Sequence, residues 1–108
     1  MLRLTAIVTM RPDQVPEAVR RGQELLAQDP DVIAGEVGRC IPVRAGMPTA
    51  SYVLTATFAD RAAFDRYAAS DEHRELLAWA LPRMLEEQVV LHEVATSKDA
   101  SGQPGEHA

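Results

Sequence analysis

Two side chains in the second half of the sequence carry the most useful chemistry. Tyr67 and His73 lie on either side of a short polar break at Ser70 and Asp71. An imidazole titrates close to neutral pH, so His73 is a candidate general base. A phenol offers a single directed O–H, so Tyr67 is a candidate hydrogen-bond donor to a developing oxyanion. Because a helix break separates the two residues, their meeting depends on the fold and not on helical spacing.

The immediate neighbours of His73 act on its pKa in opposite directions. Ser70 is a good N-cap, which places His73 in the first turn of a helix, where the positive end of the helix dipole disfavours an imidazolium. Asp71 and Glu72 stabilise the imidazolium instead. The sequence leaves open which effect is larger, and with it the protonation state of His73.

The remaining reactive side chains have plainer interpretations. Cys40 is the only cysteine, and we interpret it as a strand residue packed as a small hydrophobe. His92 lies among Val and Leu residues, which favours a strand or interface position. No spacing of His, Cys, Asp and Glu suggests a zinc site, and no Gly-rich phosphate loop follows a strand. We therefore expect no metal and no cofactor.

Hydrophobic spacing divides the chain into strands and helices. Asp13 is the expected cap of the first helix, Pro16 suits its first turn, and Pro82 should kink or shorten the last helix. The predicted elements are a strand at 2–10, a helix ending near 28, an irregular strand at 32–43, a strand at 51–58, a helix at 61–69, a helix from 71, and a strand at 89–94.

The order β-α-β-β-α-β predicts a ferredoxin-like α+β fold with a four-stranded antiparallel sheet. In the strand at 51–58, one face carries Tyr52, Leu54, Ala56 and Phe58. We expect this apolar face to pack against a second copy of the chain, giving a dimeric α+β barrel with an interior cavity. The predicted domain covers residues 1–96, and the small polar residues 97–108 indicate a disordered tail.

Composition narrows the partners. The chain has 108 residues, a formal net charge of −5 and a single lysine, Lys98, which argues against nucleic-acid binding. No apolar run reaches the length of a membrane span, and the segment 1–8 is too short and too broken for a signal peptide. We expect a cytoplasmic protein that pairs with itself and binds no membrane.

The segment 51–73 resembles the stress-responsive A/B barrel (Dabb) family of dimeric α+β barrels. The element Phe58-Ala59-Asp60, together with Phe64, Tyr67 and His73, matches the family pattern in register. The resemblance extends over residues 1–95. Ser70 and Asp71 stand where the family has the first histidine and the proline of its His-Pro-x-His element, and the family's other histidine positions fall on Leu4 and Tyr52.

The resemblance implies a specific chemistry. Plant members of the olivetolic acid cyclase type are polyketide cyclases whose Tyr and His match Tyr67 and His73. By resemblance, His73 would remove a proton from a carbon between two carbonyls, and Tyr67 would donate a hydrogen bond to the carbonyl oxygen as it becomes an enolate. An aldol-type cyclisation of a small, hydrophobic, polyketide-like substrate follows, without metal or cofactor. Tyr52, Leu54 and Trp79 would line the substrate cavity.

Two other functions remain open. The chain could be a non-catalytic, stress-responsive or small-ligand-binding barrel. It could also resemble the antibiotic-biosynthesis monooxygenases, cofactor-free enzymes of the same barrel type that use an Asn with Trp or His. The sequence contains no Asn, which argues against this second alternative.

Overall fold

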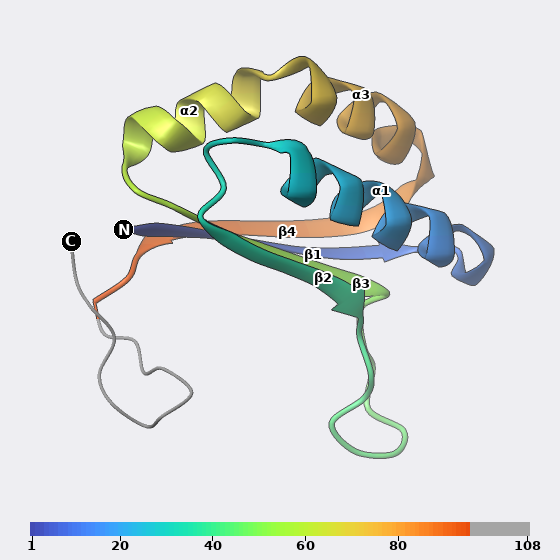
Figure 1. Cartoon of the computed structure of the whole chain (residues 1–108). Helices are drawn as coiled ribbons and strands as arrows, with labels where there is room; N and C mark the ends of the chain where they lie inside the picture. Colours follow the sequence, from blue (N-terminus) through green and yellow to red (C-terminus); the bar gives the residue numbers. More distant parts are fainter. Residues whose placement is uncertain (96–108) are drawn as a thin grey trace.

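The computed structural model of the chain describes residues 1–95, so the tail predicted at 97–108 lies outside the described residues. Three α-helices cover one face of a four-stranded sheet (Figure 1). The elements are β1 (Leu2–Met10), the 3-10 turn η1 (Pro12–Gln14), α1 (Val15–Gln28), β2 (Ala34–Arg39), β3 (Tyr52–Phe58), α2 (Arg61–Ala69), α3 (Asp71–Ala80), the 3-10 turn η2 (Leu81–Arg83) and β4 (Met84–Glu93).

All strand pairs are antiparallel, and the order across the sheet is β2-β3-β1-β4. β1 is therefore central, and β4 is an edge strand. The register places Leu4 between Ala56 of β3 and Leu91 of β4. Together with the helices on one face, this topology confirms the predicted ferredoxin-like α+β fold.

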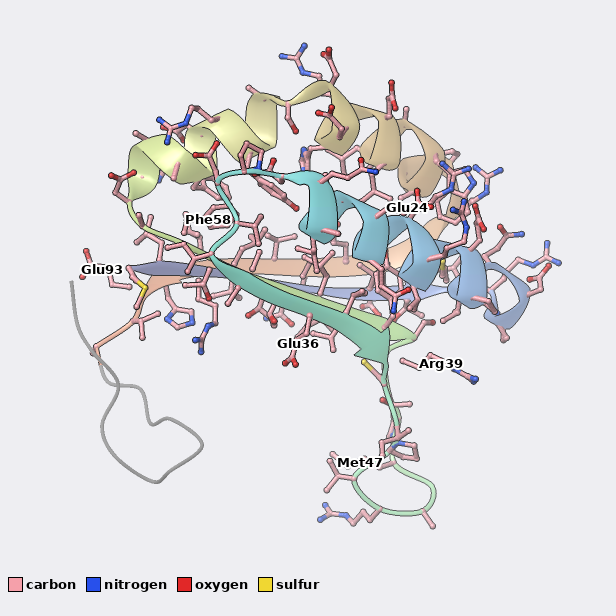
Figure 2. The ribbon with its side chains drawn as sticks, viewed as in Figure 1. Glu24, Glu36, Arg39, Met47, Phe58 and Glu93 are labelled. Atoms are coloured by element: carbon pink, nitrogen blue, oxygen red, sulfur yellow. The ribbon has the colours of Figure 1, made fainter. Side chains whose placement is uncertain are left out.

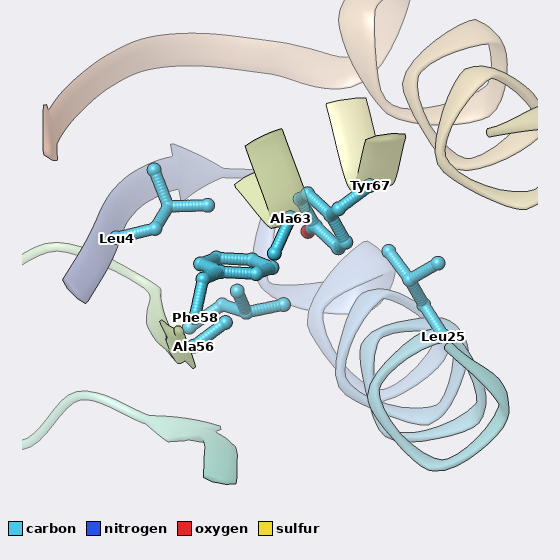
Figure 3. Packing of buried hydrophobic residues seen from close by; sticks show 7 residues of the cluster. Leu4, Leu25, Ala56, Phe58, Ala63 and Tyr67 are labelled. Carbon is cyan, nitrogen blue, oxygen red and sulfur yellow. The ribbon is translucent and has the colours of Figure 1, made fainter. Parts of the chain in front are cut away.

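The sheet face that lies under the helices, here called the inner face, carries the apolar side chains of β3. Ala56 and Phe58 are 0% exposed, and Tyr52 and Leu54 are also buried within the single chain. Figure 3 shows Phe58 next to Ala63 and Tyr67 of α2, with Ala56 beside it and Leu25 of α1 beyond Tyr67 in the same cluster. The expectation that a second copy covers this face was wrong, because α1, α2 and α3 already cover it.

The opposite face, here called the outer face, has no helix over it among the described residues. The register puts Thr5 opposite Thr55, and Ile7 opposite Val53, on this side of the sheet. Glu36 of β2 also points away from the helices (Figure 2). The connection between β2 and β3 projects from the sheet on the same side (Figure 1). The face available for self-pairing is thus the one rich in Thr and Val.

A close approach between α1 and β2 depends on a glycine. A Cβ atom at Gly35 would lie 2.9 Å from the Thr55 carbonyl oxygen and 3.0 Å from the Leu26 side chain. Only a residue without a side chain allows α1 to pack this closely on the strand.

Element boundaries differ from the predictions at three places. Asp13 lies in η1 and does not cap α1, although Pro16 does occupy the first turn. β2 is shorter than predicted, at Ala34–Arg39. β4 begins at Met84 and not at 89. Its first half is rich in exposed polar residues, which do not look like a strand in the sequence but are tolerated in an edge strand. Pro82 ends α3 at Ala80, as expected.

Within residues 1–95, no helix combines the length and apolar character needed to cross a membrane.

Candidate active site

A cavity of about 240 Å³ lies between the inner face of the sheet and helices α2 and α3. This cavity lies within one chain. The cavity predicted between two paired copies stays a prediction. Its wall is mostly aliphatic and aromatic, as is usual for small-molecule sites. The lining residues are Leu4, Ala6, Val8, Tyr52, Leu54, Phe64, Tyr67, Ala68, His73, Leu76, Leu77, Ala80, Met84, Glu87 and Val89.

Ser70 joins the two helices that carry the candidate catalytic side chains. Its hydroxyl donates to the Tyr67 carbonyl oxygen at 2.8 Å and accepts from the His73 backbone N–H at 3.2 Å. It therefore ends α2 and caps α3 at the same time. Ser70, which stands where the Dabb pattern has a histidine, thus holds the junction between α2 and α3 that separates Tyr67 from His73.

Tyr67 lies deep in the site. Its side chain is 2% exposed and packs against Phe58, with ring centroids 5.0 Å apart. Burial raises the pKa of Tyr67 to about 12, and the Asp29 carboxylate adds to this effect. The phenol therefore keeps its proton over the whole physiological pH range and can act as a hydrogen-bond donor.

His73 is held in one orientation by the backbone. Its Nδ1 lies 3.1 Å from the Ala68 carbonyl oxygen. A carbonyl oxygen only accepts, so Nδ1 carries the proton of the neutral ring and Nε2 keeps its lone pair. The tyrosine and histidine ring centroids are 4.8 Å apart. The structure thus brings Tyr67 and His73 together at the same cavity.

The sequence left open whether the pKa of His73 is raised or lowered, and the structure shows that it is lowered. Burial lowers the pKa of His73, and this effect exceeds the opposing contributions of the Ala68 carbonyl and of the Asp29 and Glu87 carboxylates. At neutral pH the ring is therefore mostly neutral and able to accept a proton.

The other predicted site residues divide into two groups. Tyr52 and Leu54 line the cavity. Trp79 does not line it; the guanidinium groups of Arg21 and Arg83 lie 4.8 Å and 4.7 Å from its ring centroid. The expectation of a cavity-lining tryptophan was wrong, because α3 turns this residue toward α1.

Cys40 and His92 lie away from the cavity. Cys40 is partly buried and is the first residue of the connection between β2 and β3. His92 is exposed on β4, opposite Arg3. Within residues 1–95, no group of three or more His, Cys, Asp or Glu side chains is arranged to hold a metal ion.

Sequence reasoning missed Glu87, which is the only acidic residue in the cavity lining of the described chain. The strand was expected to begin at 89, so Glu87 fell outside it. Its alternation with Val89 and Leu91 is the signal that could have placed it on the inner face.

The chain matches no family model, and no curated protein matches it. The comparison with solved structures is more informative. A dimeric ferredoxin-like protein of unknown function from Thermobifida fusca is 22% identical, with a TM-score of 0.75 over 86% of this chain and 90% of that one. The chain has a ferredoxin-like fold.

Two further solved structures show which kinds of protein share this fold. A Dabb family protein from Mesorhizobium loti is 18% identical, with a TM-score of 0.69 over 86% of this chain and 95% of that one. SnoaB, a cofactor-independent oxygenase from Streptomyces nogalater, is 16% identical, with a TM-score of 0.69 over 89% of this chain and 94% of that one. At these identities the likeness establishes the fold alone.

Proposed function

We propose that the protein is a cofactor-independent enzyme of the polyketide cyclase type, with His73 as general base and Tyr67 as hydrogen-bond donor to the enolate. The observation that carries this proposal is the contact between His73 Nδ1 and the Ala68 carbonyl oxygen, 3.1 Å apart. It leaves Nε2 as the proton acceptor of a neutral ring at an apolar cavity. The neighbouring phenol supplies the complementary donor.

The reaction needs only these two groups. Nε2 of His73 takes a proton from a carbon between two carbonyls, and the electron pair of the C–H bond becomes the enolate. The Tyr67 O–H stabilises the negative charge on the enolate oxygen. The enolate carbon then attacks a second carbonyl of the same molecule, forming the C–C bond. The alkoxide that results recovers the proton from the His73 imidazolium, so His73 is again neutral.

We further propose that the protein is a homodimer that pairs through the outer face. The Thermobifida fusca structure is described as dimeric, as are two other similar structures. Ile7, Val53 and Val90 share the outer face, and Val90 is 41% exposed in the single chain. Pairing would remove this apolar surface from water.

The test follows proton loss from the central carbon of a panel of β-diketones and β-keto esters by NMR in deuterated buffer, together with cyclised product from linear triketones. His73→Gln should lower turnover about a hundredfold or more. Tyr67→Phe should lower it by a similar factor, because it removes only the hydroxyl.

The matched control is His92→Gln, which changes an exposed histidine away from the cavity and should leave turnover unchanged. Equal rates for wild type, His73→Gln and Tyr67→Phe would remove the assignment. Ligand binding without any turnover would favour the non-catalytic barrel instead.

A second candidate is a cofactor-free monooxygenase. The likeness to SnoaB and to a solved antibiotic biosynthesis monooxygenase, 22% identical with a TM-score of 0.68, favours it. The absence of Asn from the sequence argues against it. Oxygen uptake in the presence of phenolic substrates, lost in His73→Gln, would support this candidate over the cyclase.

A further inference from the structure

Glu87 occupies an unexpected place on the inner face. It pairs with Val8 of β1, and Val8 pairs in turn with Tyr52 of β3, so the three residues form one row across the sheet. The neighbouring row on the inner face is entirely apolar and consists of Val89, Ala6 and Leu54. A carboxylate at this position gives the edge strand no packing advantage.

The carboxylate is not balanced by a positive charge in the cavity wall. No Lys or Arg is among the lining residues of the described chain. Arg21 of α1 and Arg83 of η2 do not line the cavity and are stacked on the Trp79 ring. Arg21 is also paired with Glu17, and Arg83 donates to the Trp79 carbonyl oxygen.

The charge of Glu87 acts on the cavity interior. Burial raises the pKa of the Tyr52 phenol, and the Glu87 carboxylate raises it further. The same carboxylate opposes the lowering of the His73 pKa by burial. These two side chains come from β3 and α3, so the negative potential of Glu87 reaches both walls of the cavity.

We propose that Glu87 determines substrate specificity: the cavity takes a small apolar compound that carries an ammonium or hydroxyl group at the end near Glu87, and it rejects compounds with a carboxylate there. The assignment of this compound as a carbonyl substrate rests on the proposed function. The charge preference itself does not.

The physical reason is charge complementarity against an apolar wall. A carboxylate only accepts hydrogen bonds, so it favours a donor on the ligand and repels an acid. Apolar surroundings strengthen both effects, whereas the exposure of Glu87 at the cavity edge weakens them. We expect an ammonium ligand to bind about five times more tightly than its neutral counterpart, and a carboxylate to bind more weakly by about the same factor.

The test uses three ligands of one shape: phenylbutylamine, phenylbutanol and phenylbutyrate. Their dissociation constants are measured by calorimetry and by NMR shifts of the cavity residues, on wild type and on Glu87→Gln. Wild type should prefer the amine, then the alcohol, then the acid. Glu87→Gln should bring the amine and acid constants within about twofold of each other.

The matched control is Glu86→Gln. Glu86 is the adjacent residue of β4 and pairs with Thr9 on the outer face, so this variant changes the net charge equally outside the cavity. It should keep the wild-type order.

Equal binding of amine and acid by wild type would overturn the inference, as would a Glu86→Gln effect equal to that of Glu87→Gln. Binding of none of the three ligands would also overturn it. These equilibrium measurements stand apart from turnover, so loss of the cyclase assignment with the charge preference intact would leave Glu87 as the specificity residue of a binding protein.

Discussion

The two faces of the sheet belong to the same strands but carry different side chains and have different surroundings. The inner face lies under three helices, is buried within one chain and contains the cavity with Tyr67 and His73. The outer face carries Thr5, Thr55 and Val53 and meets no helix of the described residues. One chain by itself therefore brings Tyr67 and His73 to a cavity on the inner face. The outer face is the one that the proposed self-pairing would cover.

The largest expected difference between the faces is in stability. Leu54→Ala, on the inner face, should lower the free energy of unfolding by about 2–5 kcal/mol, because a buried leucine leaves a cavity that relaxes only partly. Thr55 follows Leu54 in the sequence and lies on the outer face. Thr55→Val keeps the volume and the β-branching of the side chain and should change the free energy of unfolding by less than about 0.5 kcal/mol. Urea denaturation measures both, and equal losses would show that both faces are packed alike.

The next expected effect separates self-association from folding. Val53→Lys adds a charge to the centre of the outer face and should weaken dimerisation at least about tenfold while the protomer stays folded. Light scattering during gel filtration gives the mass, and circular dichroism reports folding. Gln28→Lys adds the same charge at the exposed end of α1 and should remain dimeric. A dimer unaffected by Val53→Lys would move the interface away from the outer face.

A smaller effect is expected from the helix N-caps above the inner face. Ser70→Ala and Asp60→Ala each remove a helix N-cap and should each cost about 1 kcal/mol in thermal or urea denaturation. Only Ser70 bonds to both Tyr67 and His73, so only Ser70→Ala should also lower turnover, through the turnover number more than the Michaelis constant. An equal loss of turnover in Asp60→Ala would reduce Ser70 to an ordinary cap.

The smallest expected effect concerns pH. Because the pKa of His73 is lowered, the turnover rate should be at its maximum at neutral pH. It should fall only when the solution is acidified below the ordinary histidine pKa. Tyr67, with a pKa of about 12, should cause no alkaline loss in the accessible range. Glu87→Gln removes a carboxylate that raises the His73 pKa, so the acid limb should move to lower pH by less than about one unit.

Glu86→Gln is the control for the pH profile, since Glu86 lies on the outer face and should leave the acid limb in place. A profile in which activity requires the protonated form of His73, rising as pH falls, would contradict its assignment as a base.

The stability of the folded protein, like its turnover, should decrease when the solution is acidified. A histidine whose pKa is lower in the folded state stabilises the protein above its unfolded pKa, and this contribution is lost as pH falls through the folded pKa. The melting temperature of wild type should therefore fall faster on acidification than that of His73→Gln.

The sequence by itself determined most of the local structure. The alternation of residues 51–58, the proline after α3 and the small polar N-caps fix strands and helices through local physics, and β1, α2 and the end of α1 lie where they were expected. The order of these elements also determined the ferredoxin-like topology. The pairing of Tyr67 with His73 came from the family resemblance, because no local rule joins two residues across a helix break.

Only the tertiary structure decided which face of β3 the helices cover, where Trp79 points and that Glu87 lies at the edge of the cavity. A period of two distinguishes the faces of a strand but does not say what lies against each. That choice depends on the direction of the crossover helices and on the pairing of β1 with β4, which join residues far apart in the chain. The same long-range packing sets the burial that keeps His73 neutral, so the chemistry of the site is a property of the fold.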